Sequence, residues 1–223
     1  MAETKDKTSM GIPVKTLLRG DGPTVRMYDD IAKKYAERRT SSEASVLFWD
    51  EQCRNFATLL KKSGNSILEV GCGPGVEAKY FIKEGYAVLG LDASEGMLAE
   101  ARQRVPEGTF MRMDMRDMEE LKDGCFSGVW CCASLLHLAK AEAPRAVREF
   151  RRVIKDDGTL FISLKKGDGE GMVRSPDGCD RFFAYYQKAE AEKLMCDCGF
   201  AVYDSYEFEK FGETWLCIFA VPG

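Results

Sequence analysis

The most constraining feature of the sequence is a regular alternation of short apolar runs with segments of helical period. The apolar runs lie at 66–70, 86–92, 108–114, 126–134 and 159–165. The helical patterns lie between and after them, at 75–85, 94–105, 141–154 and 187–199. Strands and helices that alternate in this way form a mostly parallel sheet with helices on both faces. The sequence therefore predicts a doubly wound α/β fold.

The two ends of the chain add to this alternation. Runs at 200–209 and 213–222 are separated by a short turn, which predicts a hairpin that adds an antiparallel strand to the parallel sheet. Residues 1–23 are polar and rich in glycine and proline, so we expect a flexible arm there. The remainder, 24–223, is expected to be one domain that begins with helical patterns at 24–39 and 44–60 within a covering segment, 24–63.

Composition narrows the class of protein. The chain of 223 residues is 45% hydrophobic and 30% charged, as is usual for a globular protein, and its net charge of -4 provides no basic field for nucleic acid. Nine cysteines without a CxxC pair and a single histidine predict no metal site and a reducing, cytoplasmic location. No apolar run reaches the roughly 18 residues that a membrane span needs. We expect a monomer or homodimer.

A glycine-rich loop, EVGCGPGVE, joins the first predicted strand to the first helix. Gly71, Gly73 and Gly75 would let a ligand approach the backbone at the helix N-terminus, although a glycine-rich turn without a ligand remains an alternative. A dinucleotide fingerprint needs a small residue where Val76 stands, which disfavours a nicotinamide cofactor. Glu69 would repel phosphates and attract a cationic ligand, which indicates S-adenosylmethionine.

Two further carboxylates follow the next strands. Asp92 is placed to accept hydrogen bonds from ribose hydroxyls, or else it caps the helix that begins near Ser94. Asp114 can accept the adenine amino group while Met115 packs on the ring. Both predictions place a nucleoside at the carboxyl edge of the sheet.

Taken together, Glu69 to Gly75, Asp92, Asp114 and GVWCCASLLHL resemble the class I S-adenosylmethionine-dependent methyltransferases, over roughly residues 24–223. The resemblance implies seven strands in the order 3-2-1-4-5-7-6, with the last antiparallel. It places Tyr28 and Tyr35, which otherwise pack in the core, over the cofactor. The cofactor contacts that it implies are Tyr35, Glu69, Gly71, Cys72, Gly73, Gly75, Asp92, Ala93, Met97, Asp114, Met115, Cys131 and Cys132.

The acceptor of the methyl group is expected beside a long connection, residues 165–187. Such loops are usually functional, and this one follows the carboxyl end of a strand. Arg181 and Tyr185 suit an acidic or aromatic small molecule, although the aromatic residues of this loop can equally anchor it to the core. We therefore expect this connection to form a lid and a wall of the substrate site.

Methyl transfer needs few catalytic residues, because the protein mainly positions and desolvates the reactants. His137 is the single imidazole available as a base or substrate contact, unless it is structural. Tyr28, Tyr35 and Tyr185 are alternative groups that orient the acceptor. The leading hypothesis is transfer to an oxygen or nitrogen atom of a small metabolite. The alternatives are an enzyme acting on RNA or protein, and a non-catalytic partner that binds the cofactor.

Overall fold

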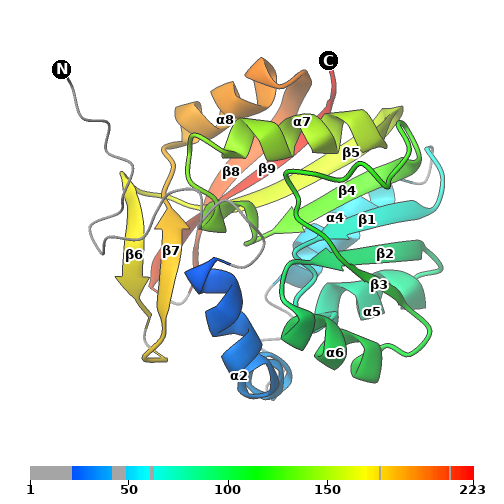
Figure 1. Ribbon diagram of the computed structural model, residues 1–223. Coiled ribbons are helices and arrows are strands. Elements are labelled where there is room, and N and C mark those ends of the chain that lie inside the picture. The colour runs from blue at the N-terminus through cyan, green and yellow to red at the C-terminus, as the bar shows by residue number, and fades with distance from the viewer. Residues whose placement is uncertain (1–21, 42–48, 61–62, 176, 211) are drawn as a thin grey trace.

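A computed structural model describes residues 22–41, 49–60, 63–175, 177–210 and 212–223 (Figure 1). Its central element is a seven-stranded sheet in the order β3-β2-β1-β4-β5-β9-β8. The strands are β1 Ser66–Val70, β2 Ala87–Asp92, β3 Thr109–Arg112, β4 Phe126–Cys132, β5 Ile154–Lys165, β8 Phe200–Lys210 and β9 Glu213–Pro222. The expected arm, 1–23, lies almost wholly outside the described residues, as does 44–48 of the second predicted helix.

The directions of the strands confirm the predicted sheet. Strands β1 to β5 are mutually parallel, and β9 runs antiparallel to both β5 and β8. The observed order equals the expected 3-2-1-4-5-7-6 once β8 and β9 are counted as the sixth and seventh strands. The labels differ because a separate hairpin, β6 and β7, precedes them in the chain.

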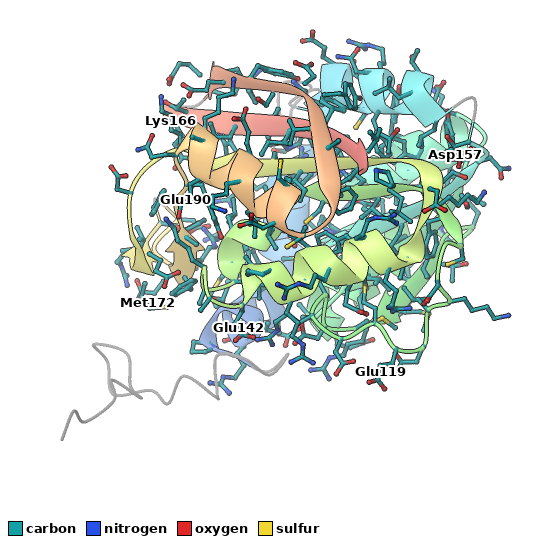
Figure 2. The ribbon with its side chains drawn as sticks, turned by 90° about the horizontal axis from the view of Figure 1, so that it is seen from above. Glu119, Glu142, Asp157, Lys166, Met172 and Glu190 are labelled. Atoms are coloured by element: carbon teal, nitrogen blue, oxygen red, sulfur yellow. The ribbon has the colours of Figure 1, made fainter. Side chains whose placement is uncertain are left out.

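Helices cover both faces of the sheet, because right-handed crossovers place the connections on opposite sides when the strand order reverses. Helices α5 Val76–Lys83 and α6 Glu95–Arg104 lie on one face, together with α4 Asp50–Leu60 (Figure 1). Helices α7 Ala143–Val153 and α8 Lys188–Asp197 lie side by side on the other face (Figure 2). None of the described helices is both long and apolar enough to cross a membrane.

The core is centred on β4, whose residues are buried along nearly its whole length, as expected for a central parallel strand. Trp130 stacks on Phe161 of β5 at 4.0 Å between ring centroids, and it also contacts Phe56 of α4 and Phe81 of α5. A Cβ atom at Gly128 would approach Phe56 to 2.6 Å, so the glycine lets α4 pack closely on β4. This packing fixes the strand ends that form the site.

Helix α2, Pro23–Thr40, lies at the edge where the parallel strands end (Figure 1). Pro23 at its first turn supplies the dihedral angle that a helix start needs. The helix packs against the N-terminal end of α6, where a Cβ atom at Gly96 would meet Ala32 and Asp29 at 3.0 Å. Gly96 therefore permits the close approach of the two helices.

The connection predicted as a loop, 165–187, contains regular structure. Strands β6 Glu170–Arg174 and β7 Asp180–Ala184 form a two-stranded antiparallel sheet beside α2 (Figure 1). Its strands have five residues each, and Gly171 interrupts the first, so the alternation of apolar and polar residues is too short to predict a strand. The connection therefore contains a hairpin that the sequence did not predict, and its part in the substrate site stays a prediction.

Candidate active site

A cavity opens at the carboxyl ends of the parallel strands, beneath α2 and the β6–β7 hairpin. Residues from segments distant in sequence line it, and they include acidic, basic, aromatic and apolar side chains and backbone at glycines. Those used below are Thr24, Val25, Tyr28, Tyr35, Arg39, Glu69, Gly71, Gly73, Glu77, Asp92, Asp114, Arg116, Cys132, Ala133, Ser134, His137, Leu138 and Phe182. The site lies where α/β sheets bind their ligands.

The three glycines of the loop between β1 and α5 have different surroundings. All have left-handed backbone, with φ of 72° at Gly71, 50° at Gly73 and 75° at Gly75. A Cβ atom at Gly71 would overlap the side chain of Ser134, and one at Gly75 would lie 3.2 Å from Ala101 of α6. A Cβ atom at Gly73 would meet nothing within 4 Å. Only Gly73 therefore presents its open side to the cavity.

Asp92, the last residue of β2, receives two backbone hydrogen bonds. The amide of Gly73 donates to Oδ2 at 2.8 Å, and the amide of Ser94 donates to Oδ1 at 2.9 Å. Ser94, not Asp92, caps α6, because its hydroxyl accepts a hydrogen bond from the Met97 amide at 3.1 Å. Burial raises the pKa of Asp92 to about 6, although the bonds from Ser94 and Gly73 oppose this shift.

Glu69 of β1 is a buried carboxyl group, 2% exposed. Within the described residues, its Oε2 atom has no hydrogen-bond partner. Burial raises its pKa, and the nearby carboxylates of Glu77 and Asp92 raise it further. Arg39 of α2 forms an ion pair with Glu77. An unpartnered buried carboxyl oxygen is costly, so the site favours a cationic hydrogen-bond donor beside Glu69.

The segment after β3 holds a buried ion pair. Arg116, 3% exposed, donates through Nε to both carboxylate oxygens of Asp114, at 2.9 and 3.1 Å. A second Arg116 nitrogen, Nη1, lies 3.7 Å from Glu142 and has no hydrogen-bond partner in the described chain. Arg116 therefore orients Asp114 at the cavity wall, while Met115 presents an apolar side chain beside it.

The end of β4 carries an unusual backbone conformation. Ala133 has φ of 50°, the single non-glycine residue with positive φ among those described. Its amide donates to Ser163 Oγ of β5 at 2.8 Å, and that hydroxyl donates to Cys132 Sγ at 3.4 Å. Left-handed alanine is strained, and such strain gathers at functional sites. The turn brings Ser134 over Gly71 and starts the short helix η2, Leu135–His137.

His137 is held by two hydrogen bonds from opposite sides. Its Nδ1 lies 2.8 Å from the Phe182 carbonyl oxygen of β7, and its Nε2 lies 3.0 Å from the Tyr28 hydroxyl of α2. Burial lowers the pKa of His137 to about 4. Because Tyr28 and His137 both line the cavity, the pair joins α2, η2 and the hairpin at the site.

Residues 67–158 match the family described as "Methyltransferase domain". The chain belongs to the class I S-adenosylmethionine-dependent methyltransferases. Among its relatives, the 18S rRNA (guanine-N(7))-methyltransferase bud23 of Schizosaccharomyces pombe is 32% identical over 158 residues, which are 70% of this chain and 57% of that protein.

Two further comparisons extend this result. A dTDP-3-amino-3,4,6-trideoxy-alpha-D-glucopyranose N,N-dimethyltransferase of Streptomyces venezuelae is 45% identical over 100 residues, 44% of this methyltransferase and 41% of the relative. The structure of magnesium protoporphyrin IX methyltransferase from Synechocystis PCC 6803 shares the fold, with a TM-score of 0.70 at 19% identity over 89% of this chain and 98% of that one. The chain spans less than two thirds of the length of the first curated relatives that it matches.

Most of the site residues expected from the sequence line the cavity of the methyltransferase. They are Tyr28, Tyr35, Glu69, Gly71, Cys72, Gly73, Asp92, Ala93, Met97, Asp114, Met115, Cys132 and His137. Gly75 and Cys131 lie outside the lining: Gly75 packs against α6, and Cys131 is fully buried. Cys131 and Cys132 separate because successive strand residues point to opposite faces.

Arg181 and Tyr185, which were expected in the catalytic set, do not line the cavity. Arg181 is buried, forms an ion pair with Asp177, and places its guanidinium 5.3 Å from the ring centroid of Tyr28. Tyr185 packs beside Phe183, with 6.1 Å between ring centroids. Arg181 therefore supports the wall behind Tyr28, and Tyr185 supports the hairpin.

Sequence reasoning missed three cavity residues that matter for the geometry: Arg39, Glu77 and Arg116. Glu77 could have been predicted from its position two residues after the last loop glycine, because the first turn of α5 faces a ligand bound at the loop. Arg39 and Arg116 reach the site only through packing of distant elements. The strained backbone of Ala133 has no signature in its side chain.

The residues present fit a cationic nucleoside cofactor. Four lining residues are carboxylic acids, namely Glu69, Glu77, Asp92 and Asp114, and Glu69 has the unpartnered oxygen that an ammonium group would satisfy. The open side of Gly73 leaves room for a ligand against the backbone. Among the described residues, no group of three or more His, Cys, Asp or Glu side chains is arranged to hold a metal ion.

Proposed function

We propose that the protein transfers the methyl group of S-adenosylmethionine to an oxygen or nitrogen atom of a small molecule. The observation that carries this proposal is the two-part lining of one cavity. Carboxylates from β1, β2 and the segment after β3 line one part, and Tyr28, His137 and Phe182 from α2, η2 and β7 line the other. The first part suits the cofactor, and the second suits an acceptor.

The residues of the first part would hold the cofactor by complementary charge. Glu69 would accept hydrogen bonds from the ammonium group, and Asp92 from the ribose hydroxyls. Asp114 would accept the adenine amino group beside Met115. The bound cofactor supplies a methyl group on a positively charged sulfur. Burial makes each of these polar contacts stronger than it would be in water.

The second part would position the acceptor and exclude water. Val25, Leu138 and Phe182 give it apolar walls, and Thr24 ties α2 to the hairpin by accepting a hydrogen bond from the Phe182 amide at 3.0 Å. Holding the acceptor atom in line with the methyl group provides much of the rate of such a displacement. The walls around Tyr28 therefore suit a small molecule that carries an aromatic or apolar body.

RNA is the second candidate acceptor, favoured by the relative that methylates guanine N7 of 18S rRNA. A guanine base would have to leave its stack to reach the cavity. Guanine N7 is a hydrogen-bond acceptor without a proton, so its methylation requires no base. The two candidates therefore differ in whether the reaction needs proton removal.

Calorimetric titration with S-adenosylmethionine, S-adenosylhomocysteine and NAD tests the cofactor. We expect binding of the first two only, with affinity that falls as pH decreases below about 6, because protonated Asp92 loses its capacity to accept two hydroxyl bonds. Asp92→Asn should weaken S-adenosylhomocysteine binding by roughly 10- to 100-fold, as expected for losing a hydrogen bond to a charged group. Asp204→Asn on the exposed edge strand β8 is the matched control.

Unchanged affinity in Asp92→Asn would contradict the assigned ribose contact, and binding of NAD alone would overturn the proposal. The acceptor is then sought by measuring formation of S-adenosylhomocysteine with panels of phenols, small acids and amines, and with a guanine-containing RNA. Product formation with a small molecule supports the first candidate. Product formation with RNA alone supports the second.

A further inference from the structure

His137 of η2 links α2 and β7 through two hydrogen bonds, and the chemistry of its partners fixes the position of its proton. A carbonyl oxygen can only accept a hydrogen bond, so the 2.8 Å contact to the Phe182 carbonyl places the imidazole proton of neutral His137 on Nδ1. The Nε2 lone pair then accepts the proton of the Tyr28 hydroxyl at 3.0 Å. The Tyr28 oxygen keeps lone pairs for a second hydrogen bond.

The position of this pair leaves Tyr28 available to a ligand. Tyr28 and His137 are both half-buried, and both line the cavity. The ring of Tyr35 meets Tyr28 edge-on at 5.6 Å, and the ring of Phe183 lies 5.0 Å from His137. These neighbours fix both rings, so the hydrogen-bonded geometry is present before an acceptor arrives.

Burial and the charges around the pair keep His137 neutral at physiological pH. Burial lowers the pKa of His137 most, the hydrogen bond with the Phe182 carbonyl raises it, and Arg181 from β7 and Lys165 from β5 lower it further. Around Tyr28, burial, Tyr35, Asp92 and Asp177 raise the pKa of the phenol, while Arg181 lowers it. Both groups therefore enter the reaction uncharged, with His137 able to take one proton.

We infer that Tyr28 and His137 form a proton relay in which the Tyr28 oxygen contacts the acceptor and His137 Nε2 receives the proton. This inference rests on the proposed methyl transfer and makes Tyr28 a catalytic residue of it. Because neutral His137 is a weak base, the relay serves an acceptor that becomes strongly acidic once methylated. A hydroxyl group or a weakly basic aromatic N–H meets that condition, whereas an aliphatic amine does not.

The step balances within the site. The acceptor lone pair forms a bond to the methyl carbon while the carbon–sulfur bond breaks and leaves its electron pair on sulfur. The proton of the acceptor passes to the Tyr28 oxygen as the Tyr28 proton passes to His137 Nε2. The resulting imidazolium donates to the Tyr28 oxygen and to the Phe182 carbonyl, and it later loses its added proton to water.

The single histidine of the chain allows a direct test without cofactor or acceptor. In untagged protein labelled with [15N]histidine, the two ring nitrogens are followed by NMR between pH 4 and 8. We expect the Nδ1–H tautomer at pH 7 and a titration midpoint near 4. Tyr28→Phe should shift the Nε2 signal and lower the midpoint, because the imidazolium loses a charge-assisted hydrogen bond that is stronger than the one the neutral ring loses. Tyr203→Phe on the exposed edge strand is the control.

An Nε2–H tautomer, or an Nε2 signal that Tyr28→Phe leaves unchanged, would overturn the relay. With a phenol from the acceptor panel, Tyr28→Phe and His137→Gln should each lower turnover by roughly 100-fold, in the usual range for acid–base catalysis. The double variant should lose little more than either single variant, since the two residues act in series. Transfer to aliphatic amines alone would overturn the acceptor class.

Calorimetry separates this inference from the proposed function. His137→Gln should bind S-adenosylhomocysteine as the unchanged protein does, because the relay faces the acceptor. If neither protein binds it, the proposed function fails while the NMR result still reports on the hydrogen bonds of His137. If both bind and the variants turn over a phenol at the unchanged rate, the relay alone fails.

Discussion

At the scale of single residues, the glycine loop shows that similar residues serve different purposes. A Cβ atom at Gly71 would overlap Ser134, and one at Gly75 would lie 3.2 Å from Ala101, so at both positions a side chain would meet protein atoms. Gly73 has open space where a side chain would stand. The cofactor would therefore exploit one of the three glycines directly, while the other two hold the loop against β4 and α6.

This difference predicts separable effects on stability and binding. Gly73→Ala should cost about 1–2 kcal/mol of unfolding free energy for its left-handed backbone and should also weaken S-adenosylhomocysteine binding at least tenfold, because the methyl group enters the cavity side. Gly71→Ala should cost more than Gly73→Ala, because overlap with Ser134 adds roughly 1–3 kcal/mol. Urea unfolding and calorimetry measure the two quantities.

Gly124→Ala provides a matched control for Gly73→Ala. Gly124 also has left-handed backbone, with φ of 56°, and open space at its Cβ position, but it lies in an exposed turn outside the cavity lining. The two alanine variants should lose similar stability, and only Gly73→Ala should lose affinity. Equal affinity in both would show that Gly73 does not face the cofactor.

At the scale of elements, α2 covers the cavity, and Asp29 joins it to the N-terminal end of α6. Asp29 Oδ1 accepts hydrogen bonds from the Ser94 hydroxyl at 2.6 Å and the Gly96 amide at 2.9 Å. A carboxylate at a helix N-terminus is favoured by the unpaired amides and the helix dipole. The amide of the same Ser94 donates a hydrogen bond to Asp92. This contact therefore couples α2 to the predicted ribose site.

Asp29→Ala should therefore lower both stability and cofactor affinity. We expect a loss of about 1 kcal/mol in unfolding free energy, typical of a removed cap, and a several-fold weaker binding of S-adenosylhomocysteine because α2 is held less firmly. Chemical denaturation and calorimetry provide the measurements. Asp30→Ala, its exposed neighbour on the same helix, should change neither by more than about 0.5 kcal/mol.

At the scale of the whole molecule, one cavity is lined by elements from most of the chain. Its walls come from α2 near the start, from the ends of β1, β2 and β4, and from β7 near residue 182. Helix α2 is joined to the other parts by side-chain contacts such as Thr24 with Phe182 and Arg39 with Glu77. A ligand that fills the cavity would contact all of them at once, and so would stabilise the domain as a unit.

Thermal unfolding tests this expectation. At about 100 times its dissociation constant, S-adenosylhomocysteine should add roughly 2.7 kcal/mol to the free energy of unfolding. For a chain of this length that corresponds to an increase in Tm of about 5–10 °C. NAD at the same concentration should give no increase. A ligand-induced shift that survives unchanged in Asp92→Asn would indicate binding elsewhere on the molecule.

The order of the sheet was implied by the resemblance to the methyltransferase family. The sequence by itself determined the fold class and the position of the glycine loop. These depend on local periodicity and on turn residues, which act between neighbours in the chain, and on the right-handed crossover that nearly all βαβ units obey. The same local patterns placed Glu69, Asp92 and Asp114 at strand ends, where they were found. The hairpin was missed because its two strands are too short for such a pattern.

Only the tertiary structure decided which of these residues meet and what each one faces. Tyr28 and His137 are 109 positions apart, and the Phe182 carbonyl that orients the imidazole is 45 positions further along the chain. Arg181 does not line the cavity, and its guanidinium pairs with Asp177 and lies 5.3 Å from the ring centroid of Tyr28. Such contacts depend on three-dimensional packing, since the composition of a segment does not specify which distant groups will surround it.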